Sequence, residues 1–194
     1  MNTLIKQAIA AVEPRRTFLG QAGLLLSGTA IALLSGREAL AAKAAKADHA
    51  VENDLRILNT ALGAELEAIA AYQVGAESGL MQKPVLDLAV TFQGHHKQHA
   101  ELLAATIGKL GGRAVAAKDK YSFPVDTLKN QTDVLRFAAG LEKGAVSAYL
   151  GAIPLFGNRD LAKAAGSILG DEAMHWAILR NAVGDVPVPD AFVA

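Results

Sequence analysis

After residue 50, apolar residues recur at spacings of three and four, which is the period of one face of an α-helix. Four such faces follow one another along the chain, over residues 55–72, 85–110, 135–153 and 161–182. No useful length of this region alternates apolar and polar residues, as a half-buried strand would. The pattern therefore predicts an all-α protein built from four helices.

Residues typical of helix ends separate the four segments. Pro84 suits the first turn of the second helix, and Gly111 and Gly112 suit its end. Thr132 and Asn158 are the predicted N-caps of the third and fourth helices.

The lengths of the connections predict the topology. About five residues separate the first helix from the second and the third from the fourth, so each pair should form an antiparallel hairpin. About 20 residues connect the two hairpins, and at ~3.3 Å per extended residue they can run the full length of a helix. We therefore expect a four-helix bundle of two antiparallel hairpins joined by one long crossover.

The two halves of this bundle repeat one another. The matched positions of the first and third helices are Leu58 and Leu135, Glu65 and Glu142, Ile69 and Val146, and Tyr72 and Tyr149. In the second and fourth helices, His96 matches Glu172 and His99 matches His175. The repeat predicts a pseudo-two-fold axis through the bundle, so both halves should contact whatever lies on that axis.

Ionisable side chains interrupt the apolar face of every predicted helix. They are Glu65, His96, His99, Glu142, Glu172 and His175. Burying such a group without a partner is unfavourable, and carboxylates at one level of a core repel one another unless a cation compensates. Because residues i and i+3 share a helix face, the second and fourth helices can each aim two ligands at one point. The pattern therefore predicts a metal site inside the bundle.

Over roughly residues 52–183, the chain resembles the ferritin-like di-metal carboxylate proteins, which use a Glu on two helices and Glu-x-x-His on the other two. It is most similar to the bacterial members that carry twin-arginine signals. By position, the resemblance implies that Glu65 and Glu142 are terminal ligands. It implies that Glu172 is a bridging ligand and that His99 and His175 are the histidine ligands. The implied fold is a ferritin-like four-helix bundle, and the implied cofactor is iron or manganese.

Two tyrosines lie on the same faces as the glutamates. Tyr72 and Tyr149 each follow a glutamate by two helical turns, after Glu65 and Glu142 respectively. They resemble the tyrosines that hydrogen-bond the ligating groups in that family. The alternative is that both are core tyrosines whose hydroxyls have other partners.

His96 departs from the family pattern, which has a bridging Glu at this position. A neutral imidazole offers one lone pair and cannot span two metals as a carboxylate can. The substitution also removes one negative charge from the site. The expected cofactor is therefore one or two ions of iron or manganese, with a mononuclear site or a weakly held second ion as alternatives.

Other polar residues lie off the apolar faces. Glu67, Glu101, Lys143 and Asp171 are expected on solvated surfaces, and Glu67 is a substitute ligand if the first helix is rotated. His95 lies beside the face of the second helix and is expected on its flank rather than among the ligands.

The N-terminal residues have the pattern of an export signal. Arg15 and Arg16 precede Phe18-Leu19, a moderately apolar run covers 22–34, and 39–41 is a small-x-small cleavage pattern. The run is too short for a stable membrane span. We expect a twin-arginine signal peptide over 1–41, a linker over 42–50, the bundle over 51–184 and a tail over 185–194. A Sec-type signal and an uncleaved anchor are the alternatives.

These features bound location, partners and function. The signal predicts a periplasmic or otherwise exported protein that meets the twin-arginine translocation machinery. The chain has no cysteine, which excludes disulfides, iron–sulfur clusters and thiol catalysis, and its net charge of zero gives no reason to expect nucleic-acid binding. A homodimer is compatible with the sequence. Three functions are compatible with it: a redox enzyme acting on oxygen or peroxide, a non-catalytic metal-binding protein, and a structural, stress-related bundle of the cell envelope. No catalytic residue is assigned.

Overall fold

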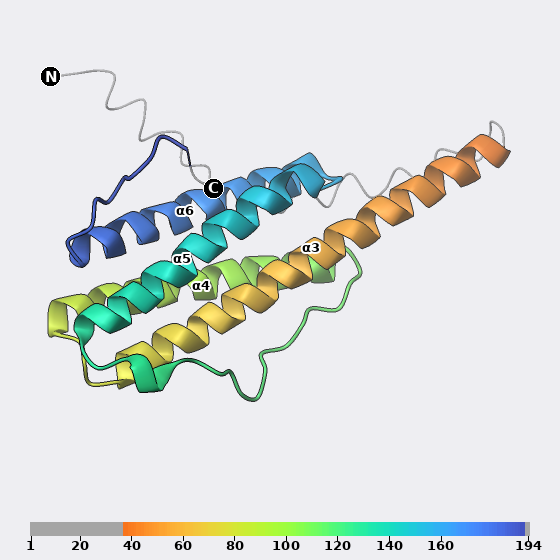
Figure 1. The fold of residues 1–194 in the computed structure, drawn as a ribbon. Coiled ribbons are helices and arrows are strands. Elements are labelled where there is room, and N and C mark those ends of the chain that lie inside the picture. Colours follow the sequence, from red (N-terminus) through yellow and green to blue (C-terminus); the bar gives the residue numbers. More distant parts are fainter. Residues whose placement is uncertain (1–36, 193–194) are drawn as a thin grey trace, which may run out of the picture. The chain divides into compact units, whose positions relative to one another are not determined.

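The computed structural model describes residues 37–192 and shows four long helices in this part of the chain (Figure 1). The long helices are α3 (Arg37–Glu77), α4 (Lys83–Lys109), α5 (Gln131–Ala152) and α6 (Arg159–Ala182). Two short 3-10 turns, η3 (Val125–Thr127) and η4 (Ile153–Leu155), complete the described elements. The four helices form a bundle within the compact unit that begins at Asp48, and the residues described contain no strand. The predicted all-α four-helix bundle is confirmed.

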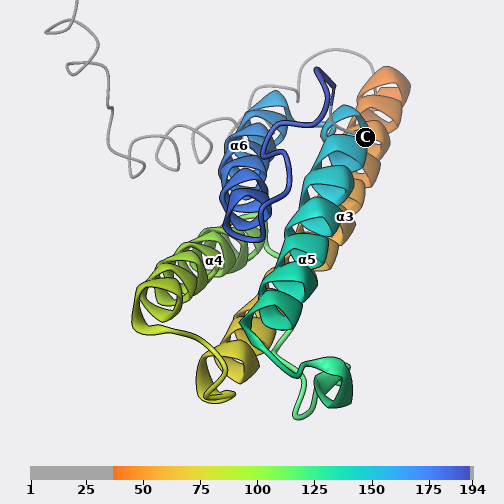
Figure 2. The same cartoon turned by 60° about the vertical axis from the view of Figure 1, so that its left-hand side comes forward.

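The order of the helices follows from their connections. The short turns α3–α4 and α5–α6 make two antiparallel hairpins, and residues 110–130 run along the outside of the bundle to join them (Figures 1 and 2). Asn59 on α3 holds this crossover in place. Its side chain donates to Arg113 O over 3.2 Å and accepts from Val115 N over 2.8 Å. The long crossover lets α5 start at the same end of the bundle as α4.

Asparagine side chains cap the N-terminal ends of α5 and α6. Asn158 caps α6 as predicted, because its Oδ1 accepts from Asp160 N over 2.8 Å. The predicted cap of α5 at Thr132 is wrong. Asn130 is the N-cap: its backbone is extended and its Oδ1 accepts from Asp133 N over 3.0 Å, so Thr132 lies inside the first turn. Asparagine caps helices at least as well as threonine, and here it stands two residues earlier.

The structure tests the predicted linker but not the predicted export signal. Residues 42–50, expected to be a linker, are helical and belong to α3. They are rich in alanine and lysine, which are strong helix formers, so this segment needs no apolar face to be helical. The paired arginines and the apolar run lie outside the described residues. Between Arg37 and Phe192, no helix is long and apolar enough to cross a membrane.

Two apolar clusters pack the bundle above and below a polar layer. The first includes Leu58, Leu62, Leu103, Ile107, Leu161 and Ile168. The second includes Tyr72, Phe92, Leu135 and Leu179. Along α3, Glu65 stands between Leu62 of the first cluster and Tyr72 of the second. The clusters therefore shield this level of the bundle from water on both sides.

Candidate metal centre

The four helices bring the six predicted ionisable side chains into one buried layer. Glu65 comes from α3, His96 and His99 from α4, Glu142 from α5, and Glu172 and His175 from α6. All are buried, and at most 6% of any of these residues is exposed. Their positions follow from helix register, because each occupies a core position between apolar neighbours of its own helix.

The six side chains form two overlapping groups. One group is Glu65, His96, His99 and Glu172, and the other is His96, Glu142, Glu172 and His175. In each group, one ligand atom per residue lies within 4.8 Å of the others. His96 and Glu172 are common to both groups. These are the two residues that the internal repeat pairs with one another.

His96 lies between the two glutamates of α3 and α5. Its Nδ1 is 2.8 Å from Glu65 Oε2, and its Nε2 is 3.3 Å from Glu142 Oε1. Burial opposes the charged form of His96, but hydrogen bonds to Glu142 and Glu65 outweigh it and raise its pKa to about 10. A neutral imidazole has only one N–H, so donation to both carboxylates requires the imidazolium. His96 thus places a cation between the two glutamates in the absence of metal.

In both His99 and His175, Nδ1 faces the core carboxylates and Nε2 faces Asp171. The Nδ1 atoms face the core carboxylates: His99 Nδ1 is 3.0 Å from Glu172 Oε1, and His175 Nδ1 is 3.5 Å from Glu172 Oε2. The Nε2 atoms face Asp171 Oδ2, at 3.3 Å from His99 and 3.5 Å from His175. Phe92 stacks on His175, with ring centroids 4.0 Å apart. One carboxylate therefore lies within 3.5 Å of the outer nitrogen of both histidines, the position of the outer partners of metal-binding histidines.

The position of Asp171 corrects the sequence analysis, and His95 makes a contact that the sequence did not predict. Asp171 was expected on a solvated surface, but only 21% of its side chain is exposed and it contacts both core histidines. His95 lies on the flank of α4 as expected, with 37% of its side chain exposed, and its Nδ1 is 2.9 Å from His175 Nε2. Each lies one helical turn before a core histidine, Asp171 before His175 and His95 before His99. That i, i+4 spacing was the signal available in the sequence.

The two tyrosines cross between the halves of the bundle. Tyr149 on α5 donates to Glu65 Oε1 on α3 over 2.6 Å, and Tyr72 on α3 donates to Glu142 Oε1 on α5. Burial, reinforced by the carboxylate that each one faces, raises the pKa of both hydroxyls well above the usual value. Both tyrosines therefore remain protonated donors and hold one oxygen of each glutamate.

The charges of the three glutamates are not equivalent. Burial would raise the pKa of Glu65, but its hydrogen bond with His96 and its contact with His99 lower it to about 2. The pKa of Glu142 is also lowered, because contacts with His175 and His96 outweigh its burial. The pKa of Glu172 is raised, since burial dominates and it is fully enclosed. Glu172 is the carboxylate that the protein's own groups stabilise least.

Five buried side-chain atoms of the described residues have no hydrogen-bond partner. They are His99 Nδ1, His175 Nδ1, Glu142 Oε2 and both oxygens of Glu172. Buried polar atoms are rarely left this way in folded proteins. All five belong to the ionisable layer and lie on the sides of these residues that face one another. A set of imidazole nitrogens and carboxylate oxygens suits iron, manganese or zinc, so these residues fit a bound transition metal.

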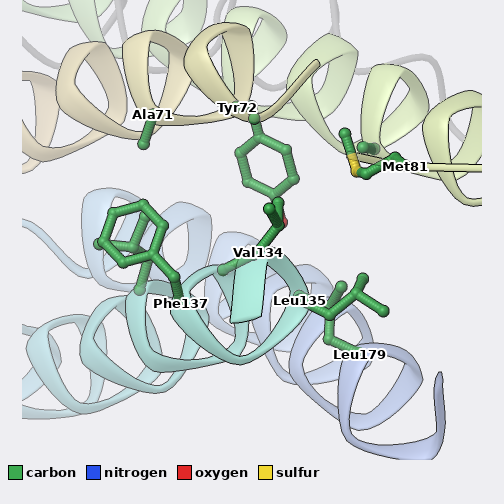
Figure 3. A pocket seen from close by; sticks show the side chains of 11 residues that line it. Ala71, Tyr72, Met81, Val134, Leu135, Phe137 and Leu179 are labelled. Carbon is green, nitrogen blue, oxygen red and sulfur yellow. The ribbon is translucent and has the colours of Figure 1, made fainter. Parts of the chain in front are cut away.

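An apolar pocket adjoins this layer on the side of Tyr72 (Figure 3). Its labelled walls are Ala71, Tyr72, Met81, Val134, Leu135, Phe137 and Leu179. The pocket has about 20 Å³, room for one very small molecule, and its lining is almost entirely apolar. Tyr72 forms part of the wall while its hydroxyl bonds Glu142. Tyr72 therefore connects the pocket wall with the carboxylate of Glu142.

Comparisons with known proteins agree with this geometry. A family model described as the ferritin-like domain matches residues 53–185. No curated protein matches the chain.

Solved structures with the same fold come from several bacteria. A conserved hypothetical protein from Mycobacterium tuberculosis is 21% identical, with a TM-score of 0.63 over 73% of this chain and 97% of that one. A ferritin-like, diiron-carboxylate protein from Bacillus anthracis str. Ames is 20% identical, with a TM-score of 0.61 over 70% of this chain and 98% of that one. The bacterioferritin-related protein of Bacteroides fragilis, a dodecameric thioferritin, is 24% identical, with a TM-score of 0.60 over 69% and 86%.

Proposed function

This chain belongs to the ferritin-like domain family, and on that premise we propose that its core binds one or two ions of iron or manganese and reacts with dioxygen or peroxide. The observation that carries the proposal is the burial of Glu172 without a hydrogen bond, although three histidine rings lie 3.0–3.6 Å from its oxygens. This carboxylate is fully buried, and neither of its oxygens has a hydrogen bond. An ionised carboxylate in such a place is strongly unfavourable unless it ligates a cation.

The residues of the layer divide into ligands and groups that hold the ligands. The proposed ligands are Glu65, Glu142, Glu172, His99 and His175, with His96, which belongs to both donor groups, as the sixth. When bound, iron or manganese would supply redox chemistry and open coordination positions for oxygen or peroxide. Tyr149 and Tyr72 orient the two glutamates of α3 and α5, and Asp171 orients the two histidines. The apolar clusters on both sides keep bulk water away from the layer.

His96 bears on the number of ions. Its ring belongs to both donor groups, with one nitrogen toward Glu65 and the other toward Glu142. A neutral imidazole has one lone pair, so it can ligate in only one group at a time. Glu172 has two free oxygens and can serve both groups. The arrangement therefore favours one firmly held ion and a second, weaker one.

Metal analysis of the purified protein tests the proposal. We expect between one and two ions per chain after loading with iron(II) or manganese(II) under anaerobic conditions, and consumption of dioxygen or peroxide by the loaded protein. Glu172→Ala should bind at least tenfold less tightly, while Glu101→Ala, an exposed carboxylate of α4, should bind as the wild type does. Binding without oxygen or peroxide consumption would leave a metal-binding protein that is not a redox enzyme. No binding at all would leave a structural bundle.

We also infer that the protein is exported by the twin-arginine pathway to the periplasm or beyond. Arg15 and Arg16, the apolar run and the small-x-small pattern at 39–41 support this inference. That pathway carries folded proteins, so the buried layer would receive its metal in the cytoplasm before export. A site closed between two apolar clusters suits such an order of events.

A further inference from the structure

A second cluster of metal-binding side chains lies next to the buried layer. It consists of His95, Asp171 and His175, whose ligand atoms lie within 4.8 Å of one another. His95 Nδ1 is 2.9 Å from His175 Nε2 and 3.1 Å from Asp171 Oδ2, and the latter two atoms are 3.5 Å apart. The side chains of His95 and Asp171 are 37% and 21% exposed, whereas His175 is buried. The cluster therefore reaches from solvent to the wall of the core.

The spacing of these atoms matches a tetrahedral metal site. Bonds of ~2.0–2.2 Å from a tetrahedral ion to nitrogen and oxygen place neighbouring ligand atoms about 3.3–3.6 Å apart. The three measured separations are 2.9, 3.1 and 3.5 Å, so binding needs only a slight opening of the cluster. Two imidazoles and one carboxylate leave one position for water, which is the donor set of an open, solvent-reached site.

We propose that His95, Asp171 and His175 form a loading site, which takes a divalent transition metal from solvent and passes it to the buried carboxylates. The proposal rests on the proposed core site for the destination of the ion. His175 connects the two places, because its Nε2 belongs to the loading site and its Nδ1 faces Glu142 and Glu172. Neutral imidazole has one lone pair, so His175 serves one place at a time. Serving the core instead would require the other neutral tautomer of His175, in which solvent takes the proton from Nδ1 and returns one to Nε2, which lies 2.9 Å from His95 Nδ1 and 3.5 Å from Asp171 Oδ2.

The first test measures the rate of metal uptake. His95→Ala removes one ligand of the loading site and none of the proposed core ligands. His49→Ala, whose side chain is 82% exposed and which lies near Glu52 on α3, is the matched control. Metal-free wild type and variants are mixed with manganese(II) or cobalt(II) and a competing chromophoric chelator. His95→Ala should load about tenfold more slowly than the wild type and reach the same final content of core ions, whereas His49→Ala should load at the wild-type rate. An unchanged rate in His95→Ala overturns the proposal.

The second test detects the ion in the loading site itself. Glu172→Gln weakens the core site and leaves the three loading residues in place, and circular dichroism verifies that the bundle has formed. With cobalt(II), this variant should bind one ion with the strong visible absorption of tetrahedral coordination, and adding His95→Ala should abolish it. Equal binding by the single and double variants, including no binding by either, overturns the loading site. If the core proposal alone fails, wild type and Glu172→Gln bind the same single ion, and His95→Ala loses it.

Discussion

Tyr149 donates a hydrogen bond to Glu65 across 2.6 Å, although the two residues lie on different halves of the internal repeat. Tyr72 makes the reciprocal bond, from the first half to Glu142 in the second. Each half of the bundle thus supplies the tyrosine that holds the other half's glutamate. The two bonds hold α3 and α5 in register at the level of the proposed metal site. The ligand geometry therefore depends on both hairpins at once.

Removing one of these hydroxyls should weaken both the fold and the site. Tyr149→Phe leaves Glu65 Oε1 without its tyrosine partner, and a buried hydrogen bond to a charged group contributes about 1.5–3 kcal/mol to stability. We expect a loss of about 2 kcal/mol in the free energy of unfolding of the metal-free protein, and at least tenfold weaker metal binding. Urea unfolding and metal titration measure the two effects. Tyr121→Phe, in the crossover, is the control and should change neither.

The metal-free protein should lose stability as the pH rises above about 6.5. Although burial opposes it, contacts with the core carboxylates raise the pKa of His96 to about 10 and those of His99 and His175 to about 9. In the unfolded chain these pKa values are about 6.5. A folded pKa above the unfolded one gives a contribution that is complete below about 6.5 and is lost as the pH passes through about 9 to 10.

At acid pH the stability of the metal-free protein should change in the opposite direction and fall as the pH falls. The pKa of Glu65 falls to about 2 because His96 and His99 outweigh its burial, so its contribution is present above the unfolded value of about 4.5 and is lost toward pH 2. Stability of the metal-free protein should therefore peak between pH about 4.5 and about 6.5, measured by urea unfolding in the presence of a chelator. Metal affinity should rise with pH, because ligation needs neutral imidazole. If the free energy of unfolding does not fall above about pH 6.5, the ion pairs of the buried layer are contradicted.

Helix register explains why the residues of the buried layer could be predicted from the sequence. A glutamate at a core position is conspicuous when every neighbour at a spacing of three or four is apolar, as around Glu65 and Glu142. The burial of Asp171 and the contact of His95 with His175 were missed because both residues lie at the edge of their helix faces. At such a position, burial depends on how far the helix is rotated toward its neighbour, and the hydrophobic period does not determine that rotation.

Two other differences arose from local structure. Residues 42–50 have no apolar stripe, so the periodicity gave no helix signal, although alanine and lysine are helical by propensity alone. The start of α5 was placed two residues late because both Asn130 and Thr132 can cap, and only the backbone at Asn130 is extended. In both cases, the spacing of apolar residues gave no information, and local helix or capping preferences determined where the helix begins.

Filling the apolar pocket should slow the reaction with dioxygen more than the reaction with peroxide. Ala138 lines the pocket, and Ala138→Val would occupy much of its roughly 20 Å³. Dioxygen is apolar and can enter a pocket with apolar walls, whereas hydrogen peroxide must give up its hydrogen bonds to do so. Stopped-flow oxidation of the metal-loaded protein by each oxidant measures the two rates. Ala104→Val, next to the other apolar cluster, is the control and should leave the ratio of rates unchanged.

Export should require the paired arginines. Replacing Arg15 and Arg16 by lysine keeps the charge but removes the residues that the twin-arginine pathway requires. We expect the variant to accumulate in the cytoplasm with an intact N-terminus, whereas the wild-type protein is exported and begins near Ala42. Cell fractionation and N-terminal sequencing measure this. Undiminished export of the double lysine variant would point to a Sec-type signal.

The most discriminating substitution is His96→Glu, because its expected effect changes sign with metal. At this position the ferritin-like pattern has a bridging carboxylate, and the structure places His96 in both donor groups. Glutamate would add two ligating oxygens and one negative charge where two dications would lie. The variant should therefore bind a second iron or manganese ion more tightly than the wild type, as isothermal titration or metal analysis would show.

Without metal, the same variant should be less stable than the wild type. His96 as imidazolium contacts Glu65 and Glu142, and the substitution replaces that cation by a fourth carboxylate in a buried layer. Breaking a buried ion pair in this way costs about 3–5 kcal/mol. His96→Gln separates the two causes, because it removes the cation without adding a charge, and it should be destabilised less and gain no second ion. Thermal unfolding with and without manganese compares all three proteins. If His96→Glu is as stable as the wild type in both conditions and binds no additional ion, His96 does not occupy a bridging position between the two donor groups.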